Sequence, residues 1–290
     1  MKRLALTSIL LGGLLASCSE MPAAPSFTAF VADPVLIGAG DIANCSSPGT
    51  ALTAALLDVT GGTVFTAGDN AYMTGSYSDY MRCYEPHWGR HKGRTLPVPG
   101  NHEYETPGAQ GYFEYFGGRA SPPGLGYYSV TLGRWLVLAL NSSADASASS
   151  AQMSWLKSTL QQFHGACVAA IWHYPVLSSG PNGGSPEMFE AWRVLHAAGA
   201  DLVITGHEHL YERYAPLDGE RQPAPRGMRQ FVVGTGGTML ARIHSVRPGS
   251  QVQGTSWGVL KVTLRPESYE WEFMPAEPGA FRDQGQELCR

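Results

Sequence analysis

Aspartate, asparagine and histidine residues follow short apolar runs at five places in the chain. They are Asp41, Asp69, Asn101 with His102, His173, and His207 with His209. Apolar runs of four to eight residues between polar turns predict buried strands. In an α/β sheet the carboxyl ends of the strands meet at one edge, where such proteins bind ligands. We therefore expect these side chains to converge on a single site.

Such a cluster needs a positive charge at its centre. Asp41 and Asp69 would repel each other and lose hydration if they were buried together without one. Mixed oxygen and nitrogen ligands in this number suit two borderline or hard metals such as iron, zinc or manganese. The residues alone therefore predict a dinuclear metal centre.

The five motifs resemble, in order, the five sequence blocks of the calcineurin-like metallophosphoesterase superfamily. They read Gly40-Asp41, Gly68-Asp69-Asn70-Ala71-Tyr72, Gly100-Asn101-His102-Glu103, Trp172-His173 and Gly206-His207-Glu208-His209. The resemblance covers about residues 35–275. Within the superfamily the chain is most similar to purple acid phosphatases, in their compact form without an additional N-terminal β domain. Tyr72 lies at GDxxY spacing from Asp69, and residues 206–213 read GHEHLYER.

The resemblance implies a role for each matching residue. Metal one takes Asp41, Asp69, Tyr72 and His209, and metal two takes Asp69, Asn101, His173 and His207, so that Asp69 bridges them. The Tyr72 phenolate favours Fe(III) at metal one, beside a divalent zinc, manganese or iron ion. Ala43 stands where other branches of the superfamily carry a histidine, which leaves Tyr72 as the replacement ligand. Members of the family often carry a glycine two residues after the first aspartate, and this chain does not.

The implied reaction is hydrolysis of phosphate esters, with a phosphomonoesterase similar to acid phosphatases as the first expectation. Two metals bind the phosphate oxygens and lower the pKa of a water. His102 has no metal in this scheme and serves as general acid to the leaving oxygen or as a charge stabiliser. Asn101, His102 and Tyr211 are the expected substrate contacts, although Tyr211 and Arg213 could equally support their loop.

Three alternatives stay open. The first is a phosphodiesterase of the same fold that acts on nucleotides or lipid headgroups. The second is a surface lipoprotein that binds a phosphorylated ligand without catalysis, and the third is a redox role for an iron centre. The GTGG segment at residues 234–237 lacks a following helix signal and a GK[ST] motif, which argues against a nucleotide-binding loop. A G-x-S-x-G motif is absent, which disfavours a serine hydrolase.

Strand-like and helix-like segments alternate along the chain, which predicts an α/β fold, an αββα sandwich of two mixed sheets flanked by helices. Helices are expected over residues 51–58, after Ser149-Ser150, and along the stripe Met188, Trp192, Leu195 and His196. Hairpins are expected within residues 127–140 and 254–274. Residues 104–126, 178–186 and 215–229 are rich in proline and glycine and predict long loops.

The N-terminal residues predict export. Lys2 and Arg3 precede an apolar run that is too short to span a bilayer but typical of a secretory signal. Leu15-Ala16-Ser17-Cys18 resembles a bacterial lipoprotein cleavage box, which implies a signal peptide at residues 1–17 and a lipid on Cys18. An ordinary signal peptide is the alternative. Residues 18–32 then form a tether and residues 33–290 the catalytic domain.

This organisation places the protein outside the cytoplasm, anchored to the bacterial envelope in the periplasm or at the cell surface. Ser19 favours the outer membrane. The expected partners are a small phosphorylated substrate and the membrane, contacted through the Cys18 lipid only. The formal net charge of −4 and the lack of a basic run argue against nucleic acid, and nothing indicates a protein partner.

Four cysteines remain beside Cys18, an even number that suggests one or two disulfides outside the cytoplasm. They are Cys45, Cys83, Cys167 and Cys289. Two disulfides could form in three pairings, and the sequence does not choose among them. Metal ligation by these cysteines is not expected, because no two lie in a CxxC arrangement.

Overall fold

The computed structural model describes Met1, residues 32–120, Pro122 and residues 124–290. The predicted signal peptide apart from Met1, the lipidation site Cys18, and the tether apart from Ala32 therefore lie outside the described residues. Residues Asp33–Arg290 form one compact unit. None of the helices in the described ranges is both long and apolar enough to cross a membrane.

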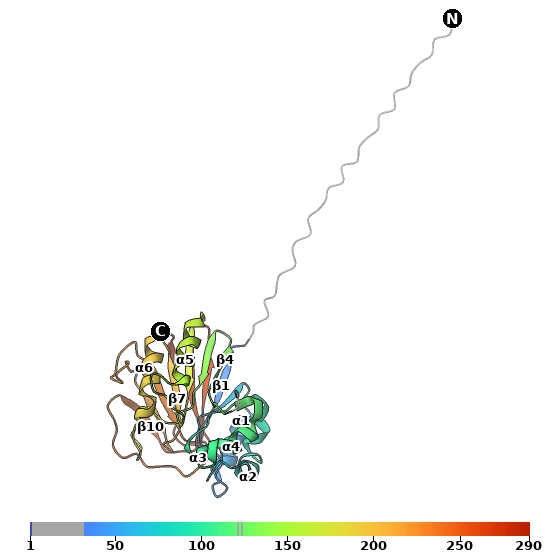
Figure 1. The fold of residues 1–290 in the computed structure, drawn as a ribbon, viewed down its shortest axis with the longest axis vertical. Coiled ribbons are helices and arrows are strands. Elements are labelled where there is room, and N and C mark those ends of the chain that lie inside the picture. The colour runs from blue at the N-terminus through green and yellow to red at the C-terminus, as the bar shows by residue number, and fades with distance from the viewer. Residues whose placement is uncertain (2–31, 121, 123) are drawn as a thin grey trace. The chain divides into compact units, whose positions relative to one another are not determined.

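Two mixed β-sheets form the centre of this unit (Figure 1). The six-stranded sheet has the order β13-β12-β11-β1-β2-β3, and the seven-stranded sheet has the order β10-β8-β9-β7-β6-β5-β4. Strands β1, β2 and β3 are parallel, as are β5, β6, β7 and β9, and the outer strands are antiparallel. The strands are β1 Val35–Ala39, β2 Thr63–Thr66, β3 Thr95–Leu96, β4 Tyr128–Leu132, β5 Trp135–Ala139, β6 Cys167–Ile171, β7 Leu202–Thr205, β8 Tyr211–Tyr214, β9 Arg229–Val233, β10 Ser250–Gly254, β11 Gly258–Leu264, β12 Ser268–Pro275 and β13 Asp283–Leu288.

Helices pack against the sheets and gather in two groups (Figure 1). The α-helices are α1 Gly49–Asp58, α2 Tyr77–Asp79, α3 Asn101–Tyr104, α4 Gln110–Phe116, α5 Ala151–Gln162 and α6 Phe189–Ala197. Shorter helical segments are η1 Tyr80–Tyr84, η2 Trp88–Arg94, η3 Pro107–Ala109, η4 Gly117–Ala120 and η5 Pro186–Met188. In Figure 1, α5 and α6 lie together, and α1 to α4 gather in the lower right part.

The alternation of side chains along β5 shows how the layers are built. Val137 and Ala139 belong to the core cluster that also contains residues of the six-stranded sheet. Leu136 and Leu138 belong to a second cluster, which they share with residues of α5 and α6. Successive strand residues face opposite sides, so one face of the seven-stranded sheet meets the other sheet and the opposite face meets the helices. The predicted αββα sandwich is confirmed.

The predicted elements are largely confirmed. Strands occur before all five site motifs, α5 begins after the N-cap Ser150, and both predicted hairpins form. The expectation of a long loop over residues 104–126 is wrong, because α4 and the helical segments η3 and η4 lie there. The buried aromatic side chains of α4 pack in an aromatic cluster that stabilises this short helix.

The four cysteines of the described residues form two disulfides. Cys45 pairs with Cys83, and Cys167 pairs with Cys289. The first bond connects the loop after β1 to η1, and the second connects β6 of one sheet to the residue that follows β13 of the other. The second bond thus joins the two sheets near the end of the chain.

Candidate metal centre

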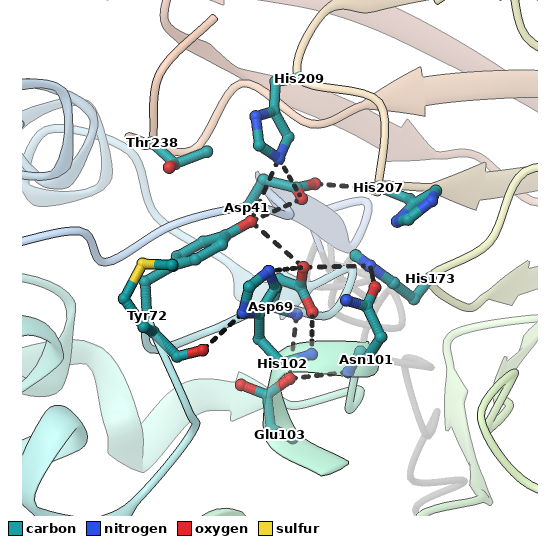
Figure 2. A network of polar contacts seen from close by, with 12 residues as sticks. Asp41, Asp69, Tyr72, Asn101, His102, Glu103, His173, His207, His209 and Thr238 are labelled. Carbon is teal, nitrogen blue, oxygen red and sulfur yellow. Dashed lines mark hydrogen bonds and ion pairs between the residues drawn. The ribbon is translucent and has the colours of Figure 1, made fainter. Parts of the chain in front are cut away.

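The ends of five strands bring the predicted site residues together. Asp41 follows β1, Asp69 follows β2, and Asn101 follows β3 at the start of α3. In the other sheet His173 follows β6, while His207 and His209 follow β7. The strands that carry these residues run parallel within each sheet, so their carboxyl ends point the same way. Because both sheets contribute residues, the site lies where the two sheets meet. The predicted convergence is observed (Figure 2).

The phenolic oxygen of Tyr72 lies at the centre of one group of ligand atoms. It is 3.0 Å from Asp41 Oδ1, 3.2 Å from Asp69 Oδ2 and 3.3 Å from His209 Nε2. His209 Nε2 is also 3.3 Å from Asp41 Oδ1. These four residues are the set expected at metal one.

A second group adjoins the first on the other side of Asp69. His173 Nε2 lies 3.3 Å from Asp69 Oδ2 and 3.0 Å from Asn101 Oδ1. Ligand atoms of Asp69, His173 and His207 all lie within 4.8 Å of one another. These four residues are the set expected at metal two.

Each carboxylate directs one oxygen at the backbone and the other at the centre. Asp41 Oδ2 accepts a hydrogen bond from the backbone N–H of His207 at 2.8 Å, and Asp69 Oδ1 accepts one from that of His102 at 2.9 Å. This leaves Asp41 Oδ1 and Asp69 Oδ2 facing the other ligand atoms. Asp69 Oδ2 is near both Tyr72 and His173, which is the position that a bridging ligand requires.

Backbone carbonyl groups orient the histidine rings. His173 Nδ1 lies 2.8 Å from the carbonyl oxygen of Ala67, and His209 Nδ1 lies 2.8 Å from that of Met239. A carbonyl oxygen only accepts, so Nδ1 carries a hydrogen, and in the neutral ring Nε2 has the lone pair that a metal would bind. This arrangement is typical of metal-binding histidines, whose second ring nitrogen is usually held in this way.

The backbone of the site is tightly constrained. Asp41, Asp69 and His207 have φ values of 59°, 50° and 70°, a left-handed conformation that non-glycine residues adopt at a cost of about 1–3 kcal/mol each. A Cβ atom on Gly100 would lie 2.2 Å from Asp69 Oδ1, and one on Gly68 would lie 2.5 Å from His173 Nδ1. The close approach of ligand side chains therefore requires glycine at both positions.

Charges within the cluster strongly perturb its titration. Burial alone would raise the pKa of Asp69, but the neighbouring His173 and His102 together outweigh burial and bring that pKa below its usual range. Burial would lower the pKa of His173, yet Asp69 raises it to about 9. Burial, followed by repulsion from His173, lowers the pKa of His207 to about 4, so His207 is neutral and able to bind a metal at neutral pH.

These observations show that the residues fit a cationic group. The hydroxyl proton of Tyr72 can serve only one of the three acceptor atoms that surround its oxygen. Burial, with the charges of Asp41 and Asp69, raises the pKa of Tyr72 well above its usual value, so without a cation the phenol stays protonated. Metal ions would satisfy the excess of acceptors, and oxygen and nitrogen donors of this kind suit iron, zinc or manganese.

His102 lies beside the cluster. The backbone carbonyl oxygen of Met73 accepts from His102 Nδ1 at 2.5 Å. The His102 ring packs at a tilt on the Tyr72 ring, with centroids 4.4 Å apart. Nε2 lies 3.8 Å from Asp69 Oδ2, and the side chain is 24% exposed. The His102 side chain is therefore partly accessible to solvent beside the cluster.

Tyr211 lies elsewhere, and its expected contact with substrate does not fit this placement. Its side chain is fully buried, its hydroxyl donates to Asp283 Oδ2 at 2.7 Å, and its ring packs on Phe273. Arg213 forms an ion pair with the same carboxylate at 2.7 Å. Tyr211 and Arg213 thus attach β8 to β13. This placement agrees with the alternative expectation, in which the two residues have a structural role.

Glu103 has a larger role than its sequence context suggests. Its buried carboxylate accepts hydrogen bonds from the backbone N–H groups of Asp69, Asn70 and Gly100 at 3.0, 2.9 and 2.7 Å, and from that of Ala71 at 3.3 Å. It fixes the loops that carry Asp69 and Asn101 relative to each other. Only its place directly after the Gly-Asn-His motif could have indicated this role.

More than half of this chain matches a known protein family. The family model described as calcineurin-like phosphoesterase matches residues 32–211. Purple acid phosphatase 15 of Arabidopsis thaliana is 30% identical over 215 residues, which cover 62% of this chain and 40% of that protein. Purple acid phosphatase 18 of the same plant is 29% identical over 185 residues, which cover 56% of this chain and 41% of that protein. The chain thus spans about two fifths of the length of these curated relatives.

Solved structures share the fold. The purple acid phosphatase PPD1 from yellow lupin (Lupinus luteus) superposes with a TM-score of 0.73 at 17% identity, over 88% of this chain and 53% of that chain. GAP50, the anchor in the inner membrane complex of Plasmodium, gives a TM-score of 0.69 at 16% identity, over 90% of each chain. At these identities the likeness shows the two-sheet architecture alone.

Proposed function

We propose that this chain, which belongs to the calcineurin-like phosphoesterase family, hydrolyses phosphate monoesters at a dinuclear metal centre. The observation that carries the proposal is the convergence of two ligand groups that share Asp69 Oδ2. The sequence similarity to two purple acid phosphatases supports a reaction of the acid phosphatase type.

The ligand assignment follows the two groups. Asp41, Asp69, Tyr72 and His209 would hold one metal, and Asp69, Asn101, His173 and His207 would hold the other. A phenolate is a hard ligand, which supports Fe(III) at the Tyr72 site with a divalent zinc, manganese or iron ion beside it. The metals would supply Lewis acidity toward the phosphate oxygens.

His102 supplies the proton for the leaving group in this proposal. Its Nδ1–H donates to the carbonyl oxygen of Met73 and fixes the ring. When the ring is protonated, Nε2–H remains free to be donated to the ester oxygen as the P–O bond breaks. The Asn101 carboxamide, 3.0 Å from His173 Nε2, lies where its side chain can also contact a phosphate oxygen.

A comparison of two aryl esters tests the proposal. Protein that begins after residue 17 is loaded with iron plus zinc or manganese, and hydrolysis of p-nitrophenyl phosphate is measured beside that of bis(p-nitrophenyl) phosphate. The Asn101→Ala variant serves as the inactive control. Faster cleavage of the monoester by wild type, with loss of activity in the variant, is the expected result.

The other outcomes separate the alternatives. If the diester is cleaved faster, the metal centre stands and the protein is a phosphodiesterase. If fully metal-loaded protein cleaves neither ester, a lipoprotein that only binds a phosphorylated ligand accounts better for the structure.

The location of the protein is a separate part of the proposal. The signal-like residues 1–17 and Cys18 support export and a lipid anchor in the bacterial envelope. Disulfides between Cys45 and Cys83 and between Cys167 and Cys289 suit an oxidising compartment. Metabolic labelling with a radioactive fatty acid tests it: wild type should incorporate label and Cys18→Ser should not, and equal labelling would contradict the anchor.

A further inference from the structure

The backbone carbonyl groups of two exposed methionines contact histidines of the candidate metal centre. The carbonyl oxygen of Met73 accepts from His102 Nδ1 at 2.5 Å, and that of Met239 accepts from His209 Nδ1 at 2.8 Å. Figure 2 shows the ring of His102 beside Asp69 and the ring of His209 beside Asp41. The backbones of both methionines are bonded to these rings, so both side chains start at the rim of the centre.

The side chains of these methionines are largely in solvent. Met73 is 62% exposed and Met239 is 73% exposed, in a chain whose large apolar side chains are mostly buried over the described residues. Exposed apolar surface is covered favourably by an apolar ligand. Methionine is unbranched and polarisable, adapts to ligands of different shape and makes favourable contacts with aromatic rings.

Tyr174 adds apolar surface on a third side. Its ring is half-buried and lies against the candidate ligands, with centroids 4.6 Å from His207 and 5.4 Å from His173. Two exposed methionines and one half-buried tyrosine therefore adjoin the candidate ligands.

We infer that this rim selects phosphate esters whose alcohol carries an aryl or arylalkyl group. The inference rests on the proposed hydrolysis at this centre and names its substrate class. In the reaction the P–O bond to the alcohol breaks, and water supplies the oxygen to phosphate and a proton to the alcohol. Proton donation by His102 would place the departing oxygen beside that ring, and we expect the rest of the alcohol to contact Met73, whose carbonyl oxygen accepts from His102 Nδ1.

A pair of substrates with similar chemical reactivity tests the inference. The ratio of kcat/KM for 3-phenylpropyl phosphate to that for glycerol 3-phosphate is measured for wild type, Met73→Gln and Met239→Gln. Both substrates release an alkyl alcohol, so the ratio reports the contact with the alcohol. Glutamine matches methionine in length and leaves the backbone carbonyl in place. The matched control is Met81→Gln, since Met81 is 43% exposed and lies in η1, outside the segments that carry the candidate ligands.

The expected ratio favours the phenylpropyl ester in wild type and falls about tenfold in at least one rim variant, which is the usual size of a lost hydrophobic contact with substrate. Met81→Gln should leave it unchanged. A wild-type preference for glycerol 3-phosphate, or equal ratios in all four proteins, would overturn the inference.

A binding measurement separates this inference from the proposed function. Calorimetry compares 3-phenylpropylphosphonate with 3-hydroxypropylphosphonate, neither of which can be hydrolysed. If no ester is cleaved but the phenyl compound binds more tightly in wild type than in the rim variants, the hydrolase proposal fails and the apolar rim stands. If esters are cleaved and the phenyl compound has no advantage, the rim inference alone fails.

Discussion

Replacement of Glu103 by glutamine should weaken both the fold and the metal centre. Its Oε2 accepts from the backbone N–H groups of Asp69 and Gly100, and its Oε1 accepts from those of Asn70 and Ala71. In the variant an NH₂ group replaces one of these oxygens. At least two buried N–H donors then lose their acceptor.

The size of the effect follows from this count. A buried donor without a partner costs about 1–3 kcal/mol, so Glu103→Gln should lower the free energy of unfolding by about 2–6 kcal/mol. The loops of Asp69 and Asn101 would also lose their common anchor, so metal affinity should fall. Urea unfolding followed by circular dichroism measures the first effect, and metal content after dialysis measures the second.

Glu105→Gln is the matched control, because Glu105 is exposed two residues away. It should keep both the wild-type unfolding free energy and the wild-type metal content. If Glu103→Gln also keeps both, the assignment of Glu103 as the anchor of the two loops is refuted.

Three further predictions concern Asp283, the disulfides and Tyr72. Burial would raise the pKa of Asp283, but hydrogen bonds from Arg213 and Tyr211 outweigh burial and lower it. The ionised carboxylate thus stabilises the fold above about pH 4 and loses this effect as pH falls through its lowered pKa. In urea titrations Asp283→Asn should lower the free energy of unfolding by about 3 kcal/mol at pH 7 and by much less near pH 2. An equal loss at both pH values would contradict this. Replacement of Cys167 and Cys289 by serine removes a bond with a sequence separation of 122 and should lower the free energy of unfolding by about 5 kcal/mol in the chain-entropy model. Replacement of Cys45 and Cys83, with a separation of 38, should lower it by about 4 kcal/mol. The reverse order of these losses in urea unfolding would count against this model. A Tyr72 phenolate bound to Fe(III) should give iron-loaded wild type a visible absorption band. Tyr72→Phe keeps the ring beside His102 but removes the phenolic oxygen, so the variant should lack this band, and a retained band would exclude Tyr72 as the iron ligand.

The strands that position the site could be predicted because each leaves a clear local signal. The runs before Asp41, Asp69 and His207 are mostly apolar and almost entirely buried, as fits central strands covered on both faces. Their polar successors then converge, because parallel strands of one sheet end at the same edge.

The edge strand β13 and the helix α4 left no such signal. Residues 283–288 form β13 at the edge of a sheet, where alternate side chains are exposed and the apolar pattern is lost. Residues 110–116 form α4 between glycines, and their helical conformation depends on aromatic packing with distant residues. Tertiary contacts of this kind override local propensity.

The side-chain roles divide in the same way. Histidine and aspartate after strand ends indicate ligands directly, whereas the role of Tyr211 depends on β13, which lies 72 residues away in the sequence. The role of Glu103 depends on four backbone N–H groups in two loops, and residue types do not show where such groups point. The pairing of the cysteines likewise required the positions of β6 and β13 relative to each other.

The metal content of catalytically active protein tests the central claim most directly. Chelator-treated chain is titrated with iron and zinc while p-nitrophenyl phosphate hydrolysis and bound metal are measured together, for wild type and for Asp69→Ala. We predict that wild-type activity rises until about two ions are bound per chain, as for other two-metal hydrolases, and that the variant retains fewer ions and is inactive. Full activity of metal-free wild type, or full activity of Asp69→Ala, would contradict a dinuclear centre bridged by Asp69.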